Sequence, residues 1–330
     1  MRALSVDDRY RGAHGIGRYA REVLPRLGMP WHPLGLSGSP HTPWDALRRV
    51  PDSAREGVVY SPGYGALVRA GRQVLTIHDL IQLQLPWPGR AKFLAYYAGP
   101  VRHVVRRAGL ILTVSQTSAA AIAEWVDDDD VRIVDAGNGC SPAFTVSGGS
   151  GHGDHGAGDP GSDPYLVFVG NLRRHKNLDV VLRALRGAAG VRLKAVLPVR
   201  EVAAAAARAR ELGVSERVAL LSGLDDEALA DLYRGAAATV MPSTIEGFGL
   251  PALESIACGV PVVHWRGCAA VSEVVGGRGW ALESATDAEE WSHALRAAAG
   301  QRRRVSPPVG AHDWDRVAAT VTQALRGIAI

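Results

Sequence analysis

Glu246 and Glu254 stand eight positions apart, and the stretch EGFGLPALE that they enclose has the residue types to bind a ligand with hydroxyls and an anionic group. Gly247 and Gly249 lack a Cβ, so a ligand can approach their backbone N–H groups closely. Pro251 suits the first position of a helix, where its missing N–H costs nothing. The spacing therefore predicts one carboxylate in a loop, one in a helix's first turn, and a helix N-terminus between them.

The predicted helix covers residues 251–258, with Gly259 in the left-handed position that ends it. Its N-terminus favours negative charge, so a phosphate could rest there. The segment then fits a sugar nucleotide, with the sugar at Glu246, the diphosphate at the N–H groups and the ribose at Glu254. Glycine, proline and a carboxylate are also common wherever a loop leads into a helix, whether or not a ligand binds there. The full string, followed by the strand PVV, is more specific than any one of its residues.

Lys176 and His78 are two further side chains whose positions suggest chemistry. Lys176 ends the string GNLRRHK between a predicted strand and a predicted helix, where its ammonium can meet a phosphate. His78 follows the predicted strand QVLTI, where its ring can hydrogen-bond a sugar hydroxyl. Alone, His78 would be read as a satisfied core histidine, and Arg173 and Arg174 as either helpers or solvated side chains. In combination with the two glutamates, Lys176 and His78 favour a binding function.

The string GIGRYA, with Gly15 and Gly17, matches the dinucleotide fingerprint GxGxxA. A single match is weak, and the acidic residue expected about 20 residues further on is absent between Trp31 and Gly38. We therefore interpret it as a glycine loop that lets a helix N-terminus approach a ligand, rather than as a nicotinamide site.

Short apolar runs alternate with helical patterns along the whole chain, which is typical of parallel βαβ units. Ligands of such sheets bind beyond the carboxyl ends of the strands, and His78, Gly170 and Glu246 all follow predicted strands. The predicted fold class is α/β, with two Rossmann-like domains facing across a cleft. The predicted strands, in chain order, are ALSV, GVVYS, QVLTI, LILTVS, RIV, PYLVFVG, RLKAVLP, RVALLSG, ATVMPS and VPVVHW.

A stretch of glycine, serine, aspartate and histidine, VSGGSGHGDHGAGDPGSDP, cannot bury a core and separates the two halves. His152 and His155 within it are interpreted as solvated rather than as metal ligands. The predicted organisation has four parts: an N-terminal domain over residues 1–150, a linker over 151–164, a second domain over 165–305, and a C-terminal helix within 306–330.

Bulk properties exclude several classes of protein. The 330 residues suggest two domains, and a formal net charge of +4 is weak for a nucleic-acid binder. Residues 1–144 hold 17 basic and 13 acidic residues, which fits an anionic ligand or a membrane-facing acceptor. The three cysteines show no CxxC spacing, and the sequence has neither a signal-peptide pattern nor a membrane-spanning apolar run. A cytoplasmic protein with at most peripheral membrane contact is expected.

Taken together, these strings resemble the family 4 glycosyltransferases, which are retaining enzymes of the GT-B architecture that use nucleotide sugars. The resemblance covers nearly the whole chain, and its most specific element is the two-glutamate motif. The strings that carry it, in order, are GIGRYAREVL, TIHDLIQLQLP, ILTVSQTSAAAI, NGCSPAF, FVGNLRRHKNLDVVLRAL and MPSTIEGFGLPALESIACGVPVV.

The resemblance implies that the N-terminal domain serves the acceptor and the second domain holds the donor nucleotide. It implies a last helix, anchored by Trp314, that packs back toward the N-terminal domain. It implies His78, Glu246 and Lys176 as catalytic residues. The implied donor-binding set is Gly15, Gly17, Gly170, Arg174, Lys176, Gly247, Phe248, Gly249, Leu250 and Glu254. One position departs from the pattern, because Asn171 stands where many relatives have arginine.

The implied reaction moves a hexosyl or other sugar from a nucleotide-diphosphate sugar to an acceptor hydroxyl with retention of configuration. No metal and no cofactor is expected, and the acceptor could be a small molecule, an oligosaccharide or a lipid-linked sugar. Two alternatives stay open at this stage: a sugar-nucleotide epimerase on the same fold, and a non-catalytic sugar-nucleotide-binding partner subunit. Nucleic acid is not an expected partner.

Overall fold

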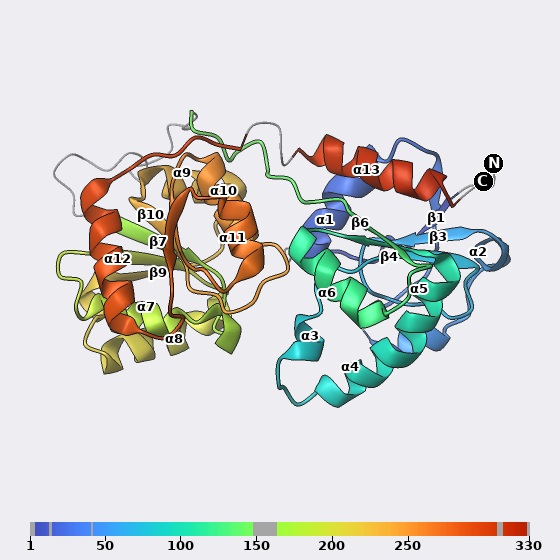
Figure 1. Cartoon of the computed structure of the whole chain (residues 1–330), viewed down its shortest axis with the longest axis horizontal. Coiled ribbons are helices and arrows are strands. Elements are labelled where there is room, and N and C mark those ends of the chain that lie inside the picture. Colours follow the sequence, from blue (N-terminus) through green and yellow to red (C-terminus); the bar gives the residue numbers. More distant parts are fainter. Residues whose placement is uncertain (1–3, 13–14, 41, 148–163, 309–312, 329–330) are drawn as a thin grey trace. The chain divides into compact units, whose positions relative to one another are not determined.

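The computed structural model describes residues 4–12, 15–40, 42–147, 164–308 and 313–328. The chain forms two compact units (Figure 1): unit 1 is Met1–Gly139 with His312–Ile330, and unit 2 is Cys140–Ala311. The division thus comes earlier than the predicted boundary at residue 150, and the C-terminal helix belongs to unit 1. The predicted linker, with His152 and His155, lies outside the described residues except for Pro164.

Unit 1 contains a parallel sheet of six strands in the order β2-β1-β3-β4-β5-β6. Parallel sheets need both faces covered, and the helices between the strands provide this cover. The strands are β1 (Leu4–Val6), β2 (Trp31–Pro33), β3 (Val58–Ser61), β4 (Arg72–Thr76), β5 (Leu110–Thr113) and β6 (Arg132–Asp135). The helices are α1 (Gly15–Val23), η1 (Leu24–Arg26), η2 (Pro43–Leu47), α2 (Asp52–Glu56), α3 (Ile81–Gln84), α4 (Arg90–Tyr96), η3 (Tyr97–Val101), α5 (Arg102–Ala108), α6 (Gln116–Val126) and α13 (Trp314–Arg326).

Unit 2 contains a second parallel sheet of six strands in the order β12-β11-β10-β7-β8-β9. Trp291 on α12 is fully buried in its core, where α12 packs against α7. The strands are β7 (Tyr165–Val169), β8 (Arg192–Val196), β9 (Val218–Leu221), β10 (Ala238–Met241), β11 (Val262–Trp265) and β12 (Gly279–Leu282). The helices are η4 (Arg174–Lys176), α7 (Leu178–Leu185), α8 (Val199–Glu211), η5 (Ser215–Arg217), α9 (Asp226–Gly235), α10 (Leu250–Ala257), α11 (Ala269–Val275) and α12 (Ala288–Gln301).

The C-terminal helix α13 packs against α1 and η1 of unit 1. Trp314 at its start is 4% exposed, and its ring meets the ring of Tyr19 edge-on with 5.9 Å between centroids. Further along, the Thr322 hydroxyl accepts a hydrogen bond of 3.0 Å from the Gly28 backbone N–H. These contacts hold α13 against the rest of unit 1.

The α/β fold class and the parallel strands predicted from the alternation are confirmed. The two strands that the sequence did not predict, β2 and β12, lie at sheet edges and are short. β2 ends in Pro33, and a proline is tolerated there because an edge strand has a free hydrogen-bonding side. None of the helices within the described ranges is long and apolar enough to cross a bilayer. That the two sheets face each other across a cleft stays a prediction.

Candidate functional site

The strand order of unit 2 by itself indicates where a ligand can bind. The chain runs from β7 outward through β8 to β9 and then returns to the other side of β7 as β10. The connections after β7 and after β10 therefore diverge, which opens a crevice at the carboxyl ends of these two paired strands. Lys176 follows β7, and Glu246 follows β10, so both predicted residues lie at this switch point.

Lys176 and Glu246 form an ion pair there. The Lys176 Nζ lies 2.6 Å from Glu246 Oε1, and the two side chains are 17% and 10% exposed. Ser243, which is buried, donates its hydroxyl to the same oxygen at 2.7 Å. Glu246 therefore has one oxygen bound by two donors, and the partly exposed pair can still meet a ligand.

The loops that carry this pair are joined by backbone and amide hydrogen bonds. The Thr244 N–H donates to the carbonyl of His175 at 2.8 Å, which ties the loop after β10 to η4. Asn177 adopts the left-handed conformation at φ 52° and donates its amide to the carbonyls of Pro242 at 3.2 Å and Ala285 at 2.7 Å. The position of Lys176 relative to Glu246 is thus fixed by the main chain on both sides.

Two titratable neighbours of the pair have shifted pKa values. Burial, followed by the charge of Lys176, lowers the pKa of His175, so its ring is neutral around pH 7. Burial and then the charge of Glu246 raise the pKa of the Cys268 thiol to about 12. Cys268 precedes α11 and is 2% exposed. Its uncharged thiol therefore packs beside the ion pair.

The N-terminus of α10 is the second feature of the site. The helix begins at Leu250, one residue before the predicted start, with Gly249 as its N-cap at φ 103° and Pro251 in its first turn. That backbone conformation requires glycine, and a Cβ at Gly249 would also lie 3.3 Å from Val271. No acidic side chain occupies the first turn, so the positive end of the helix is available for an anion. Gly259 has the predicted left-handed conformation at φ 75°.

Glu254 differs from its prediction in one respect. It lies in the second turn of α10 rather than the first, because the helix begins earlier than expected. It is 4% exposed and accepts a hydrogen bond of 3.2 Å from the Tyr233 hydroxyl of α9. Burial and the Glu254 charge raise the pKa of Tyr233 well above its usual value, so Tyr233 stays a donor. Contact between Glu254 and a ribose stays a prediction.

The remaining residues of unit 2 surround the switch point at the loop after β7. The Gly170 N–H donates to the Val196 carbonyl at 3.1 Å and ends the strand. Asn171, at the position of departure from the resemblance, accepts the Arg173 N–H at 3.0 Å and forms a tight turn. Arg174 is exposed at the start of η4, and Phe248 is buried between Gly247 and Gly249.

The two predicted glycines of unit 1 occupy an equivalent place in its own sheet, whereas His78 follows β4, away from the switch point. Its chain passes from β1 to β2 on one side and then to β3 on the other, so the loop after β1 leads from a switch point to α1. Gly15 begins α1, and a Cβ on Gly17 would lie 2.4 Å from the Gly12 carbonyl oxygen, so only glycine fits there. The His78 Nε2 lies 3.0 Å from the Pro62 carbonyl oxygen, and the His78 ring meets the ring of Tyr19 edge-on.

Known proteins are similar to this chain in sequence and in fold. Residues 156–303 match the family model of the glycosyl transferases, group 1. The solved structures similar to this chain include sucrose-phosphate synthase from Thermosynechococcus elongatus, with TM-score 0.69, 17% identity and 99% of each chain covered. They also include HepE from Anabaena, solved with UDP and glucose, with TM-score 0.68, 16% identity and 99% of each chain covered. These two likenesses show that the chain has the GT-B glycosyltransferase fold.

The curated relatives match a shorter part of the chain. The D-inositol 3-phosphate glycosyltransferase of Nocardiopsis dassonvillei is 40% identical over 122 residues, which are 33% of this chain and 28% of that protein. The protein of the same name from Corynebacterium jeikeium is 34% identical over 149 residues, 42% of this chain and 36% of that protein. The chain thus spans about a third of the length of these relatives.

Sequence reasoning identified Lys176 and Glu246 but missed Ser243 and Cys268. Ser243 lies two residues after β10, in the string MPSTIEG, so its closeness to Glu246 in the sequence could have indicated it. Cys268 comes from the next crossover and could be placed only through its packing. In the part of the chain that the structure describes, no group of three or more His, Cys, Asp or Glu side chains could hold a metal ion.

Proposed function

We propose that the chain is a family 4 retaining glycosyltransferase that moves a sugar from a nucleoside-diphosphate sugar to an acceptor hydroxyl. The observation that carries the proposal is the ion pair of Lys176 and Glu246 at the switch point of the unit 2 sheet, since it combines a cation for the diphosphate with a carboxylate for the sugar. The match of residues 156–303 to the glycosyl transferases supports it.

In this proposal Lys176 binds the departing diphosphate. Its ammonium has three N–H donors, so it can hold Glu246 and a phosphate oxygen at once. The N-terminus of α10 would add a second positive contact, and Gly170, Arg174, Phe248 and Leu250 would line the same anion. Both stabilise the negative charge that develops as the bond between the anomeric carbon and the diphosphate oxygen breaks.

Glu246 would orient the sugar. Lys176 and Ser243 both bind Oε1, which leaves Oε2 the better acceptor for a sugar hydroxyl. Glu254, oriented by Tyr233, would accept from the ribose hydroxyls. His78, for the sugar, and the loop with Gly15 and Gly17, for the diphosphate, remain part of the proposed donor-binding set.

In the proposed transfer step no side chain of the protein bonds to the sugar. The bond from the anomeric carbon to the diphosphate oxygen breaks, and the acceptor oxygen bonds to the same face of that carbon. The acceptor hydroxyl proton passes to the departing diphosphate oxygen. Neither metal nor cofactor enters this proposed step.

The acceptor class belongs to the proposal as well. The curated relatives carry the name of D-inositol 3-phosphate glycosyltransferases, but the matched segments are less than half of this chain. We therefore keep the wider class of small-molecule, oligosaccharide or lipid-linked hydroxyl acceptors, in a cytoplasmic protein with peripheral membrane contact.

One experiment tests the proposal in two stages. UDP-, GDP-, dTDP- and ADP-sugars are screened for a rise in melting temperature, since a ligand that binds only the folded state stabilises it. The best donor is then incubated with an acceptor panel in the presence of EDTA, and the products are examined by NMR. We expect nucleotide release that depends on the acceptor and a glycoside with the donor's anomeric configuration. Epimerised donor without acceptor would overturn the proposal in favour of an epimerase.

A further inference from the structure

Exposed apolar side chains gather on two neighbouring segments of unit 1. Among the described residues seven large apolar side chains are exposed, and four of them lie on η2, on α4 and in the loop just before α4. Trp44 and Leu47 on η2 are 74% and 58% exposed, and Trp87 and Leu94 are 41% and 39% exposed. η2 packs against α4, and the Trp87 ring lies 5.3 Å from the Phe93 ring of α4, so the four side chains lie on adjoining segments. Apolar groups gathered in this way on a surface usually mark an interaction site.

Basic residues outnumber acidic ones in the segments that carry these side chains. No aspartate or glutamate occurs between Leu80 and Ala123, whereas the same stretch contains five basic residues: Arg90, Lys92, Arg102, Arg106 and Arg107. Arg48 and Arg49 follow the last residue of η2. The acidic side chain of η2, Asp45, is buried, pairs with Arg9 at 2.6 Å and also lies 3.4 Å from Arg48. A partner that fits this region must therefore accept apolar side chains and carry negative charge.

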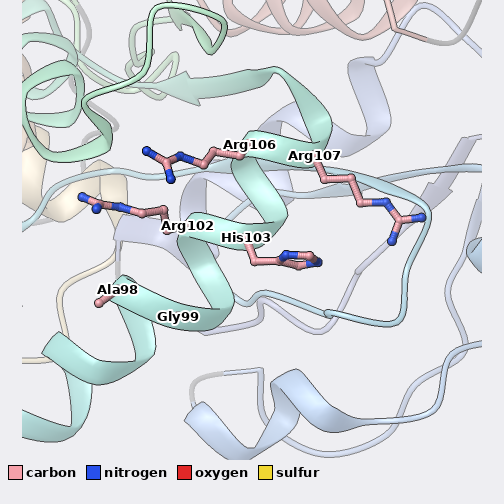
Figure 2. Close-up of a pocket in the computed structure, with 6 residues that line it drawn as sticks. All are labelled: Ala98, Gly99, Arg102, His103, Arg106 and Arg107. Atoms are coloured by element: carbon pink, nitrogen blue, oxygen red, sulfur yellow. The ribbon is translucent and has the colours of Figure 1, made fainter.

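The basic character continues along the helix. Tyr96, Tyr97, Val101, Val104 and Val105 are buried on one side of the continuous run α4, η3 and α5, so the exposed residues share the other side. Figure 2 shows Arg102 and Arg106 extending to one side of α5, and His103 and Arg107 to the other. With Ala98 and Gly99 these four line a surface cavity of about 470 Å³.

The two sides of that cavity differ in their partners. Arg102 donates to the Trp125 carbonyl and lies over its ring at 5.5 Å, and Arg106 pairs with Asp128 at 2.8 Å. These two arginines stabilise the C-terminal end of α6, and the acidic run from Asp127 begins on their side. The positive charge available to a partner is therefore that of Arg107, together with Arg90 and Lys92 of α4 and with Arg49, which follows η2.

We propose that this basic apolar face, defined by Trp44, Leu47, Arg49, Trp87, Lys92 and Leu94, docks unit 1 on an anionic lipid bilayer. Tryptophan and leucine beside basic side chains are the composition of segments that lie in the plane of a membrane interface. The negative surface potential of such a bilayer attracts each lysine or arginine, and indole rings settle at the headgroup level. This proposal rests on the peripheral membrane contact that belongs to the proposed function, and vesicle binding tests it independently of sugar transfer.

Flotation of the full-length protein with lipid vesicles tests the proposal. We expect binding to vesicles of phosphatidylcholine with phosphatidylglycerol, little binding to phosphatidylcholine alone, and release as NaCl is raised. The double variant Arg49→Glu/Lys92→Glu should bind at least about tenfold more weakly. Trp44→Ser should weaken binding about fivefold, since it removes buried apolar area at the interface.

Matched controls on unit 2 separate this face from overall charge and hydrophobicity. Arg186→Glu/Arg210→Glu changes the net charge by the same amount, and Val199→Ser removes an apolar side chain that is also 74% exposed. Both controls should bind vesicles as the unaltered protein does. The melting temperatures of all the variants should stay close to that of the unaltered protein. Absence of vesicle binding at low salt, or equal losses in the unit 2 controls, would overturn the proposal. Equal binding to neutral vesicles would overturn the electrostatic part, and with it the assignment of an anionic partner.

Discussion

Lys176 and Ser243 bind the same oxygen of Glu246, at 2.6 Å and 2.7 Å, although they come from the loops that follow two different strands. Those strands, β7 and β10, are neighbours on either side of the point where the sheet reverses its order. The site thus depends on a crossing of the chain that no local segment contains, and its function can be tested one donor at a time.

Glu246→Gln tests the role of the carboxylate. The amide keeps the size of the side chain but loses the charge that Lys176 pairs with. We expect the turnover number kcat for sugar transfer to fall about a hundredfold or more, in line with losses of transition-state contacts elsewhere. Binding of the bare nucleoside diphosphate should be kept, which calorimetry can measure. Unchanged turnover would remove Glu246 from the catalytic residues.

Ser243→Ala tests the second donor to Glu246. The carboxylate would keep Lys176 but lose a fixed orientation, so kcat should fall about tenfold while the donor KM changes little. Loss of this hydrogen bond should cost about 1 kcal/mol of unfolding free energy. A Ser243→Thr variant, which keeps the hydroxyl, should regain much of the activity. If Ala and Thr variants behave alike, the hydroxyl does not position Glu246.

Gly249→Ala tests the start of α10. At φ 103° an alanine is strained, and the folded state should lose about 1–3 kcal/mol together with donor affinity. Gly300→Ala is the matched control, because Gly300 lies within α12 and a Cβ there meets nothing within 4 Å. That substitution should stabilise the protein by about 0.5–1 kcal/mol. Similar melting temperatures for the two variants would contradict the conformation described for α10.

The buried thiols predict a loss of stability in alkali. Burial raises the pKa of Cys258 and of Cys268 to about 12 in the folded protein, above the value of 9.0 for a free thiol. The unfolded chain therefore loses these protons first, and stability is full below pH 9 and falls between pH 9 and 12. At pH 10 the titration of each thiol should lower the free energy of unfolding by about 1.4 kcal/mol. Urea unfolding at pH 8.5 and at pH 10 should show that the free energy of unfolding falls less for Cys268→Ala than for the unaltered protein. An equal fall in both proteins would contradict the burial of this thiol.

The sequence predicted the site to the extent that it depends on strand ends. Lys176 and Glu246 each follow an apolar run, and the rule for parallel sheets then brings them to one edge. Ser243 escaped notice because serine is common after strands, and Cys268 because it reaches Glu246 only through the next crossover. The start of α10 was predicted one residue late, since Leu250 rather than Pro251 is the first helical residue. The boundary between the units and the place of α13 depend on contacts distant in sequence, such as Thr322 with Gly28.

Calorimetric titration of Lys176→Ala with nucleoside diphosphates tests the central claim most directly. The unaltered protein should bind one of UDP, GDP, dTDP or ADP, and the variant should bind the same nucleotide at least about tenfold more weakly, because it lacks the charge that meets the phosphates. Arg186→Ala, at an exposed position of the same unit, should bind as the unaltered protein does. Equal affinity of the Lys176→Ala variant and the unaltered protein would contradict the assignment of this ion pair to the donor site.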